Sequence, residues 1–102
     1  LYAEDLAKCI EHLCDRDLEY SLINVGSGKE ISIYDLALLI QKVVGYEGEL
    51  SFDSSKPDGN PRKLLDSTRI NSCGWSATTS LELGLETTYK WFLENKNKNI
   101  KL

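Results

Sequence analysis

The strongest candidate for binding chemistry is a short basic loop that contains two prolines. Residues 56–63 read Lys-Pro-Asp-Gly-Asn-Pro-Arg-Lys, and they place three cations, Lys56, Arg62 and Lys63, beside one carboxylate, Asp58, in a chain whose net charge is -4. Arginine binds phosphate through its planar fork and lysine binds it as a point charge. A carboxylate can accept hydrogen bonds from sugar or base groups. A nucleoside diphosphate would suit this combination, but a solvated charged loop fits the composition equally well.

Two other clusters are weaker candidates. Cys9, His12 and Cys14 lie close in sequence, but on a helix Cys14 leaves the face that the other two share, and a structural zinc site needs four converging ligands. Buried thiols and a half-exposed imidazole are the favoured interpretation. Residues 26–28, Gly-Ser-Gly, lack the further glycine of a dinucleotide fingerprint and the Lys-Ser/Thr of a P-loop, so they predict a plain turn.

The aromatic side chains near the C-terminal end could stack on a base, but they are more typical of a core or an interface, because aromatic groups dominate the energetics of burial. They are Trp75, Tyr89, Trp91 and Phe92.

Length and composition limit the possible classes of protein. The chain has 102 residues, of which 41% are hydrophobic and 27% charged, which predicts one small packed domain or part of a larger one. Its acidic balance argues against general nucleic-acid binding. It has no apolar run of about 20 residues that would span a membrane. Three cysteines without regular spacing, and no leader pattern, favour a cytoplasmic location. Because the chain contains no methionine and opens directly on a helical pattern, we expect a piece of a longer protein.

The first half of the chain predicts two helices with a strand between them. Apolar residues at helical spacing indicate a helix over residues 4–14. The apolar run at 21–25 predicts a buried strand. Ser32 is the expected N-cap of the second helix, with Asp35 as its capping-box partner, and Gly45 is its expected left-handed stop.

The second half predicts short strands at 49–52 and 63–65, separated by a polar loop. Asp66 or Ser67 would cap one or two helical turns that end near residues 74–75. The last helix is expected to begin at Thr79, with Glu82 completing a capping box, and to run to about residue 95. Gly84 inside it suggests a close contact, because glycine otherwise weakens a helix.

These elements predict a mixed α+β lobe over residues 1–95, with about four helices and two to three short strands but no Rossmann sheet, followed by a frayed polar tail at 96–102. The predicted strands are too few for an ordinary doubly wound sheet.

Residues 51–66, Ser-Phe-Asp-Ser-Ser-Lys-Pro-Asp-Gly-Asn-Pro-Arg-Lys-Leu-Leu-Asp, resemble the signature stretch of the GDP-L-fucose synthase family. The resemblance extends over nearly the whole chain through shorter matches at 4–7, 23–28, 74–75, 80–85 and 88–92. It implies the C-terminal substrate-binding domain of an extended short-chain dehydrogenase.

The family's enzymes epimerise GDP-4-keto-6-deoxy-D-mannose at C3 and C5, and then reduce its C4 ketone with NADPH. The resemblance therefore implies a GDP-sugar substrate, a separate N-terminal Rossmann domain that binds NADP(H), and a homodimeric parent enzyme. By position, Asp58 matches a substrate-contacting aspartate, and Lys63 matches a lysine that we assign to the diphosphate. Lys56 and Arg62 lie in the same motif, and their contacts are inferred from charge and proximity.

The departures from the family's pattern concern catalysis. None of the five tyrosines has a lysine four residues later, and no cofactor fingerprint is present. We therefore expect no catalytic or cofactor-binding residue in these 102 residues, and we give no such role to Cys9, Cys73 or His12. Two alternatives stay open, namely a lobe of another nucleotide-sugar epimerase or dehydratase, and a stand-alone binding module without catalysis.

Overall fold

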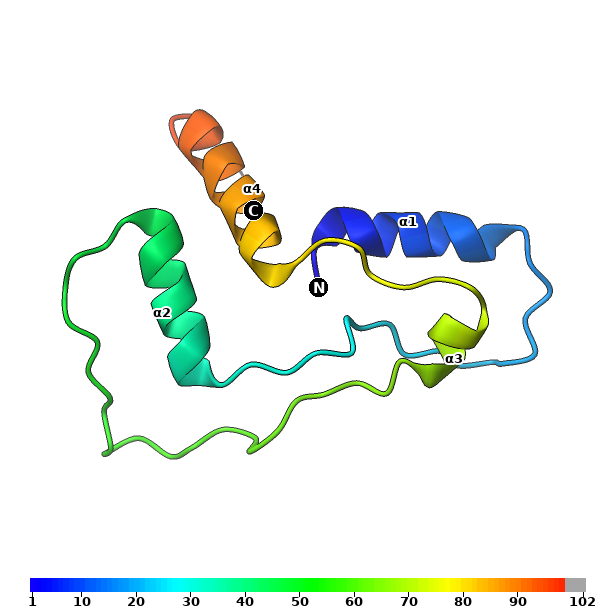
Figure 1. Ribbon diagram of the computed structural model, residues 1–102, viewed down its shortest axis with the longest axis horizontal. Coiled ribbons are helices and arrows are strands. Elements are labelled where there is room, and N and C mark those ends of the chain that lie inside the picture. Colours follow the sequence, from blue (N-terminus) through cyan, green and yellow to red (C-terminus); the bar gives the residue numbers. More distant parts are fainter. Residues whose placement is uncertain (99–102) are drawn as a thin grey trace.

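The computed structural model describes residues 1–98, which form four helices joined by long extended segments (Figure 1). The helices are α1 (Ala3–Cys14), α2 (Ile33–Val44), α3 (Thr68–Ser72) and α4 (Leu81–Asn95). Of the predicted frayed tail, residues 96–98 turn back on α4 through the Lys98 N–H, which donates to the Asn95 carbonyl at 2.9 Å. Residues 99–102 lie outside the described part. No helix within residues 1–98 is long and apolar enough to cross a membrane.

The strands predicted at 21–25, 49–52 and 63–65 are wrong, because residues 1–98 contain no strand. A strand requires a ladder of backbone hydrogen bonds to a neighbour. Here side chains take the backbone acceptors instead. Arg69 donates to the Leu22 carbonyl at 2.9 Å, and the Ser67 hydroxyl donates to the Gly26 carbonyl at 3.1 Å. The chain around residues 22–26 therefore lies alongside the chain around residues 67–69 without forming a sheet.

The predicted boundaries of α2 are confirmed. The Ser32 Oγ accepts from the Asp35 N–H at 3.0 Å, and the Ser32 hydroxyl donates back to the Asp35 carboxylate at 2.8 Å. Gly45 ends the helix with φ of 70°, which a residue with a Cβ would resist. All of these signals lie within a few residues of the helix ends, so the sequence alone locates α2.

The predicted start of α4 is wrong by one residue. Ser80 is the N-cap, and its Oγ accepts from the Leu83 N–H at 3.2 Å. Thr79 does not cap the helix, because its N–H and its hydroxyl both donate to Asp5. Glu82 completes no capping box and instead pairs with Lys42 of α2 at 2.5 Å.

Asp66 and Ser67, the two predicted caps of α3, both contribute to its start. Ser67 occupies the N-cap position but makes no capping bond with its side chain. The Asp66 carboxylate supplies that bond, since it accepts from the Thr68 N–H at 2.9 Å. The helix ends at Ser72, just before the predicted boundary at residues 74–75.

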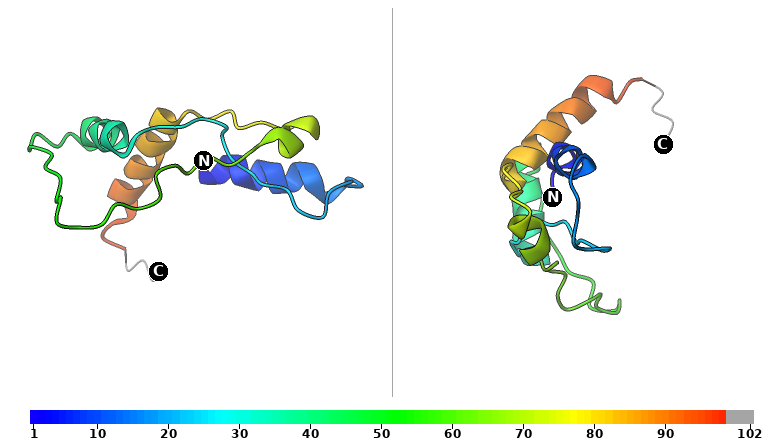
Figure 2. Two further views of the ribbon diagram at one scale, coloured as in Figure 1. Left: turned by 90° about the horizontal axis from the view of Figure 1, so that it is seen from below. Right: turned by 90° about the vertical axis from the view of Figure 1, so that its right-hand side faces the viewer.

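The expected packed core is small. In the described part of the chain the buried apolar side chains are Cys9 and Ile70, and among the helices α2 packs against α4. The radius of gyration is 17.0 Å, whereas a compact domain of this length would have about 13 Å. Figure 2 shows the open shape from two further sides. Trp91 and Phe92, expected in a core or an interface, are 54% and 48% exposed.

Gly84 makes the predicted close contact, although not with another helix. A Cβ at Gly84 would lie 3.3 Å from the Cβ of Tyr2, the residue that precedes α1. The missing side chain lets the start of the chain pack directly on α4.

Candidate functional site

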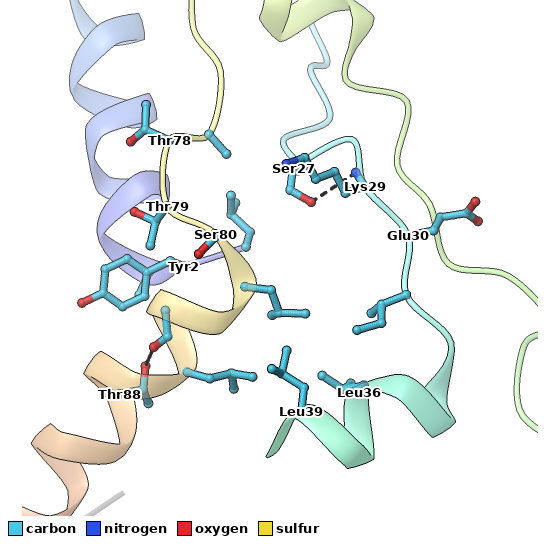
Figure 3. A pocket seen from close by; sticks show the side chains of 17 residues that line it. Tyr2, Ser27, Lys29, Glu30, Leu36, Leu39, Thr78, Thr79, Ser80 and Thr88 are labelled. Carbon is cyan, nitrogen blue, oxygen red and sulfur yellow. Dashed lines mark hydrogen bonds between the residues drawn. The ribbon is translucent and has the colours of Figure 1, made fainter. Parts of the chain in front are cut away.

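A groove of about 690 Å³ lies between α2, the first turns of α4 and the start of α1 (Figure 3). Leucines from α2 and α4, including Leu36, Leu39 and Leu85, provide apolar walls. Polar groups also line it, and Figure 3 shows Ser27 and Lys29 on one side and Thr78 and Thr88 on the other. The groove therefore combines apolar walls with a few polar groups, which is the usual composition of a small-molecule site.

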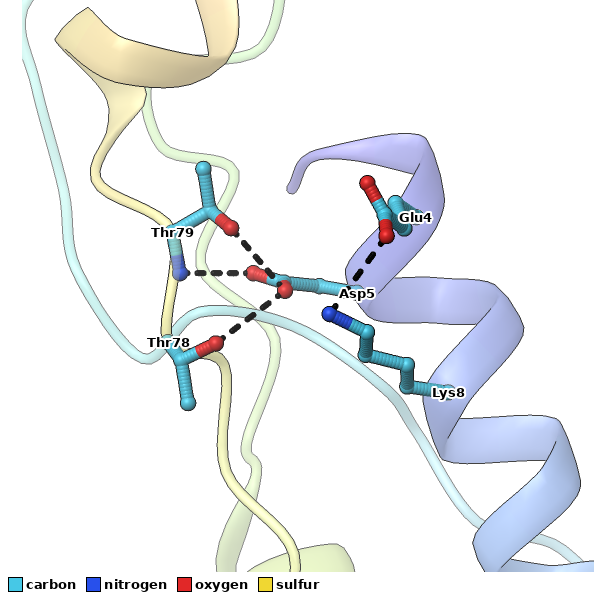
Figure 4. Close-up of polar contacts among 5 residues, drawn as sticks. All are labelled: Glu4, Asp5, Lys8, Thr78 and Thr79. Atoms are coloured by element: carbon cyan, nitrogen blue, oxygen red, sulfur yellow. Dashed lines mark hydrogen bonds and ion pairs between the residues drawn. The ribbon is translucent and has the colours of Figure 1, made fainter.

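One wall of this groove is held by the carboxylate of Asp5 (Figure 4). Asp5 is 1% exposed and accepts from the Thr79 N–H at 2.8 Å, the Thr79 hydroxyl at 3.0 Å and the Thr78 hydroxyl at 3.3 Å. The Thr79 N–H is the main reason that the pKa of Asp5 lies below its usual value, and the two hydroxyls add to it, while burial opposes it. Asp5 thus fastens α1 to the segment that precedes α4.

Sequence reasoning missed this role of Asp5. Its partners lie more than 70 residues away in the chain, so the local pattern around Asp5 does not indicate them. The run of three hydroxyl side chains at residues 78–80 was the available signal, because such residues commonly bond a nearby carboxylate or cap a helix.

The four predicted binding residues lie on the exposed segment 53–63, and none of them lines the groove. Within residues 1–98, Lys56, Asp58 and Lys63 make no side-chain hydrogen bond or ion pair. Arg62 differs, because its guanidinium grips Glu30 with two nitrogens, one of them 2.8 Å from Oε2. Among the four, the structure therefore brings only Arg62 to the groove, through a glutamate that lines it.

The Arg62 hydrogen bond to Glu30 holds the pKa of the glutamate below its ordinary value, and the charge of Arg62 adds to this effect. Inside the loop, Asp53 accepts from the N–H and the hydroxyl of Ser55 at 3.0 and 2.5 Å, which forms a local turn. The hydroxyl bond is the main cause that lowers the pKa of Asp53.

The cysteines and the histidine have structural surroundings. Cys9 is buried, as predicted, and burial raises the pKa of its thiol, with a smaller contribution from the nearby Cys73. Cys14 is exposed, so the expectation of a buried thiol is wrong there, because with 3.6 residues per turn it lies on a different side of α1 from the buried Cys9. The half-buried His12 donates through Nε2–H to the Cys73 carbonyl at 2.8 Å, which ties α1 to the end of α3.

The Gly-Ser-Gly turn at residues 26–28 lies beside the groove. The Ser27 Oγ accepts from the Lys29 N–H at 3.3 Å, and Gly28 has φ of 73°. A Cβ at Gly26 would stand 3.3 Å from that of Leu65, so glycine here allows the two extended segments to approach closely.

No family model matches the chain. It is 48% identical to the probable GDP-L-fucose synthase 1 of Oryza sativa subsp. japonica, over 93% of the chain and 29% of that protein. It is 47% identical to the GDP-L-fucose synthase of Escherichia coli K12, over 96% of the chain and 33% of that protein. The chain thus spans about a third of the length of these curated relatives.

Two solved structures from Campylobacter jejuni are similar as well. A GDP-6-OMe-4-keto-L-xylo-heptose reductase is 30% identical with a TM-score of 0.77, over 93% of this chain and 30% of that one. A GDP-mannoheptose C4 reductase with NADP bound is 32% identical with a TM-score of 0.66, over 87% of this chain and 28% of that one. Sequence and structure therefore agree that the chain is homologous to the C-terminal portion of the GDP-L-fucose synthases, in the extended short-chain dehydrogenase and epimerase family.

Proposed function

We propose that this chain is the GDP-sugar-binding lobe of an NADP-dependent enzyme that epimerises and reduces GDP-4-keto-6-deoxy-D-mannose. The observation that carries the proposal is the exposed basic loop at residues 56–63. The relatives named above act on different sugars, but each of their names contains GDP. A part of the lobe that recognises GDP would serve all of them.

The loop supplies the chemistry for such recognition. Lys56 and Lys63 are exposed cations without a partner among residues 1–98, so a diphosphate would not have to displace a competing carboxylate. Asp58 is an exposed acceptor for hydroxyl or amine groups. The loop thus has both signs of charge available for a ligand that is anionic at its centre and polar at its ends.

The residues present do not fit a resident NADP(H). The chain has no glycine fingerprint at a strand-to-helix turn and no Tyr-x-x-x-Lys pair. We assign the cofactor and the redox step to another part of the protein, and we expect residues 1–102 alone to be inactive. The C4 reductase with NADP bound, of which the chain matches 28%, is consistent with this division.

The test uses the product of the complete reading frame that contains residues 1–102. Asp58→Asn combined with Lys63→Gln removes two charge-assisted contacts, so the KM for GDP-4-keto-6-deoxy-D-mannose is expected to rise about 10-fold to 100-fold. NADPH consumption measures it. The matched control, Glu11→Gln with Lys90→Gln, also neutralises one acid and one lysine at exposed positions and should leave KM unchanged. An unchanged KM in the first pair would refute the role of the loop.

A different GDP-linked 4-keto sugar is the second candidate substrate, favoured by the likeness to the two heptose reductases. Comparing kcat/KM for GDP-linked 4-keto hexoses and heptoses decides between them. A preference for UDP-linked sugars would contradict both. A reading frame that begins just before Leu1 would instead favour a stand-alone binding module.

A further inference from the structure

Three side-chain links join the extended segment that precedes α2 to α3 and to the extended segment before α3. Arg69 bonds the Leu22 carbonyl, Ser67 bonds the Gly26 carbonyl, and Arg62 grips Glu30. The residue number of the donor falls from 69 to 67 to 62 while that of its partner rises from 22 to 26 to 30, so the two stretches run antiparallel. Of the three links, the Arg62–Glu30 pair is the one whose residue lies within the basic loop itself.

Among the described residues, this pair is also the only polar contact that attaches the basic loop to the rest of the chain. Within residues 1–98, it is the one hydrogen-bonded or ionic link between segment 53–63 and the rest of the chain. It is mostly exposed, with side chains 68% and 42% accessible, so it contributes little to overall stability. A two-nitrogen fork nevertheless fixes orientation as well as distance.

Glu30 connects the Arg62–Glu30 pair to the groove. Glu30 lines the groove, and its neighbour Lys29 lines it too. Arg62 is adjacent to Lys63 and four positions after Asp58 in the chain, so holding Arg62 at Glu30 limits where Lys63 and Asp58 can stand relative to the groove. A guanidinium with a glutamate across its fork has fewer donors left for a phosphate.

We infer that Arg62 and Glu30 form a positioning pair, in which Arg62 places the Asp58 and Lys63 side chains for the ligand instead of binding the diphosphate itself. The inference rests on the proposed function. It gives Glu30 a role in ligand binding, although an isolated acid near a diphosphate would oppose binding.

The Glu30→Gln variant distinguishes the two possible roles of Arg62, because they predict opposite changes in the inhibition constant and in KM. If Arg62 contacts the diphosphate directly, neutralising Glu30 removes a competitor and a repulsive charge, and both the inhibition constant of GDP and the KM for the GDP-sugar fall. If Arg62 is a positioning residue, both constants rise, because the loop loses its fastening. The expected rise is about 3-fold to 10-fold, of the size that a modest misplacement of two contacts produces.

The experiment compares four variants and one control variant of the complete reading-frame product with wild type. Glu30→Gln and Arg62→Gln should raise KM to a similar extent with a smaller change in kcat, and the double variant should be no worse than either single one. The charge swap, Glu30→Arg with Arg62→Glu, should recover much of the loss. Glu47→Gln, an exposed acid without a partner among residues 1–98, is the control and should match wild type.

A second readout requires no ligand. Loss of the fastening should speed tryptic cleavage after Lys63 in both Glu30→Gln and Arg62→Gln, whereas the charge swap should slow it again. Glu30→Gln with unchanged cleavage, or with a lower KM, would overturn the inference while leaving the proposed function intact. Wild-type protein that binds neither GDP nor the GDP-sugar would instead refute the proposed function, and the inference with it.

Discussion

Asp5 and Arg62 are both charged residues whose partners lie far away in the chain. Asp5 is buried and satisfied by two consecutive threonines, whereas Arg62 is exposed and paired with a single glutamate. Burial decides how much each contact matters for stability. The Asp5 contacts are shielded from water, while the Arg62 pair is screened and serves mainly to set geometry.

The lowered pKa of Asp5 makes a pH-dependent contribution to stability. Because the folded protein favours the carboxylate, this contribution is complete above the pKa of an unfolded aspartate, about 4, and is lost as the pH falls through the lower folded value. Asp5→Asn cannot ionise, so its unfolding midpoint should be lower at pH 7 and should fall less than that of wild type between about pH 5 and 2. Thermal unfolding of the complete reading-frame product measures this difference.

The control for that prediction is Asp17→Asn, at an exposed position without a hydrogen bond among residues 1–98. It should follow the wild-type curve. If Asp5→Asn and wild type lost stability in parallel on acidification, the Thr78 and Thr79 contacts would not be favouring the ionised form.

The helices show two ways in which an element can be positioned. α2 depends on signals within its own sequence, with Ser32 at one end and Gly45 at the other. The start of α4 depends on a remote residue, because Asp5 takes the donors of Thr79 and leaves Ser80 as the cap. The same contact places the first turn of α4 against the groove.

Ser80→Ala should therefore destabilise the protein by about 1 kcal/mol, the usual cost of removing a serine N-cap. The exposed Ser76→Ala, in the segment just before, makes no hydrogen bond among the described residues and is the matched control. Denaturant unfolding of the complete reading-frame product measures both free energies. Equal values for the two variants would show that Ser80 does not act as the cap.

The molecule as a whole is open. It measures 50 × 36 × 24 Å, and large apolar side chains from every long helix are exposed, among them Ile10, Ile33 and Trp91. Exposed apolar surface of this extent indicates an interface with another domain or subunit. Since the curated relatives are about three times as long as the stretch they share with the chain, we expect the remainder of such a protein to provide that cover.

Residues 1–102 expressed alone should accordingly self-associate and unfold without a sharp transition, because too few side chains are buried to support cooperativity. Light scattering across a concentration series and denaturant unfolding test this expectation, with the complete reading-frame product as the comparison. A clean monomer that unfolds cooperatively would contradict it and would favour the stand-alone binding module.

What the sequence determined by itself is local. The spacing of apolar residues, the Ser32 cap and the Gly45 stop located α2, and the motif at residues 51–66 indicated the family, because each of these signals is contained within a few neighbouring residues. The short apolar runs at 21–25 and 63–65 were predicted as strands from the same kind of local signal. A strand also needs a partner ladder, which a local pattern does not contain.

Only the tertiary structure decided the contacts between distant residues. Asp5 meets Thr79 across 74 positions, and Arg62 meets Glu30 across 32. No local pattern around Asp5 or Glu30 identifies its partner, because long-range pairing depends on where the intervening helices and turns bring the backbone. The sequence therefore predicted the residues of the basic loop, whereas the fold decided that Arg62 is engaged and that Lys56, Asp58 and Lys63 stand exposed.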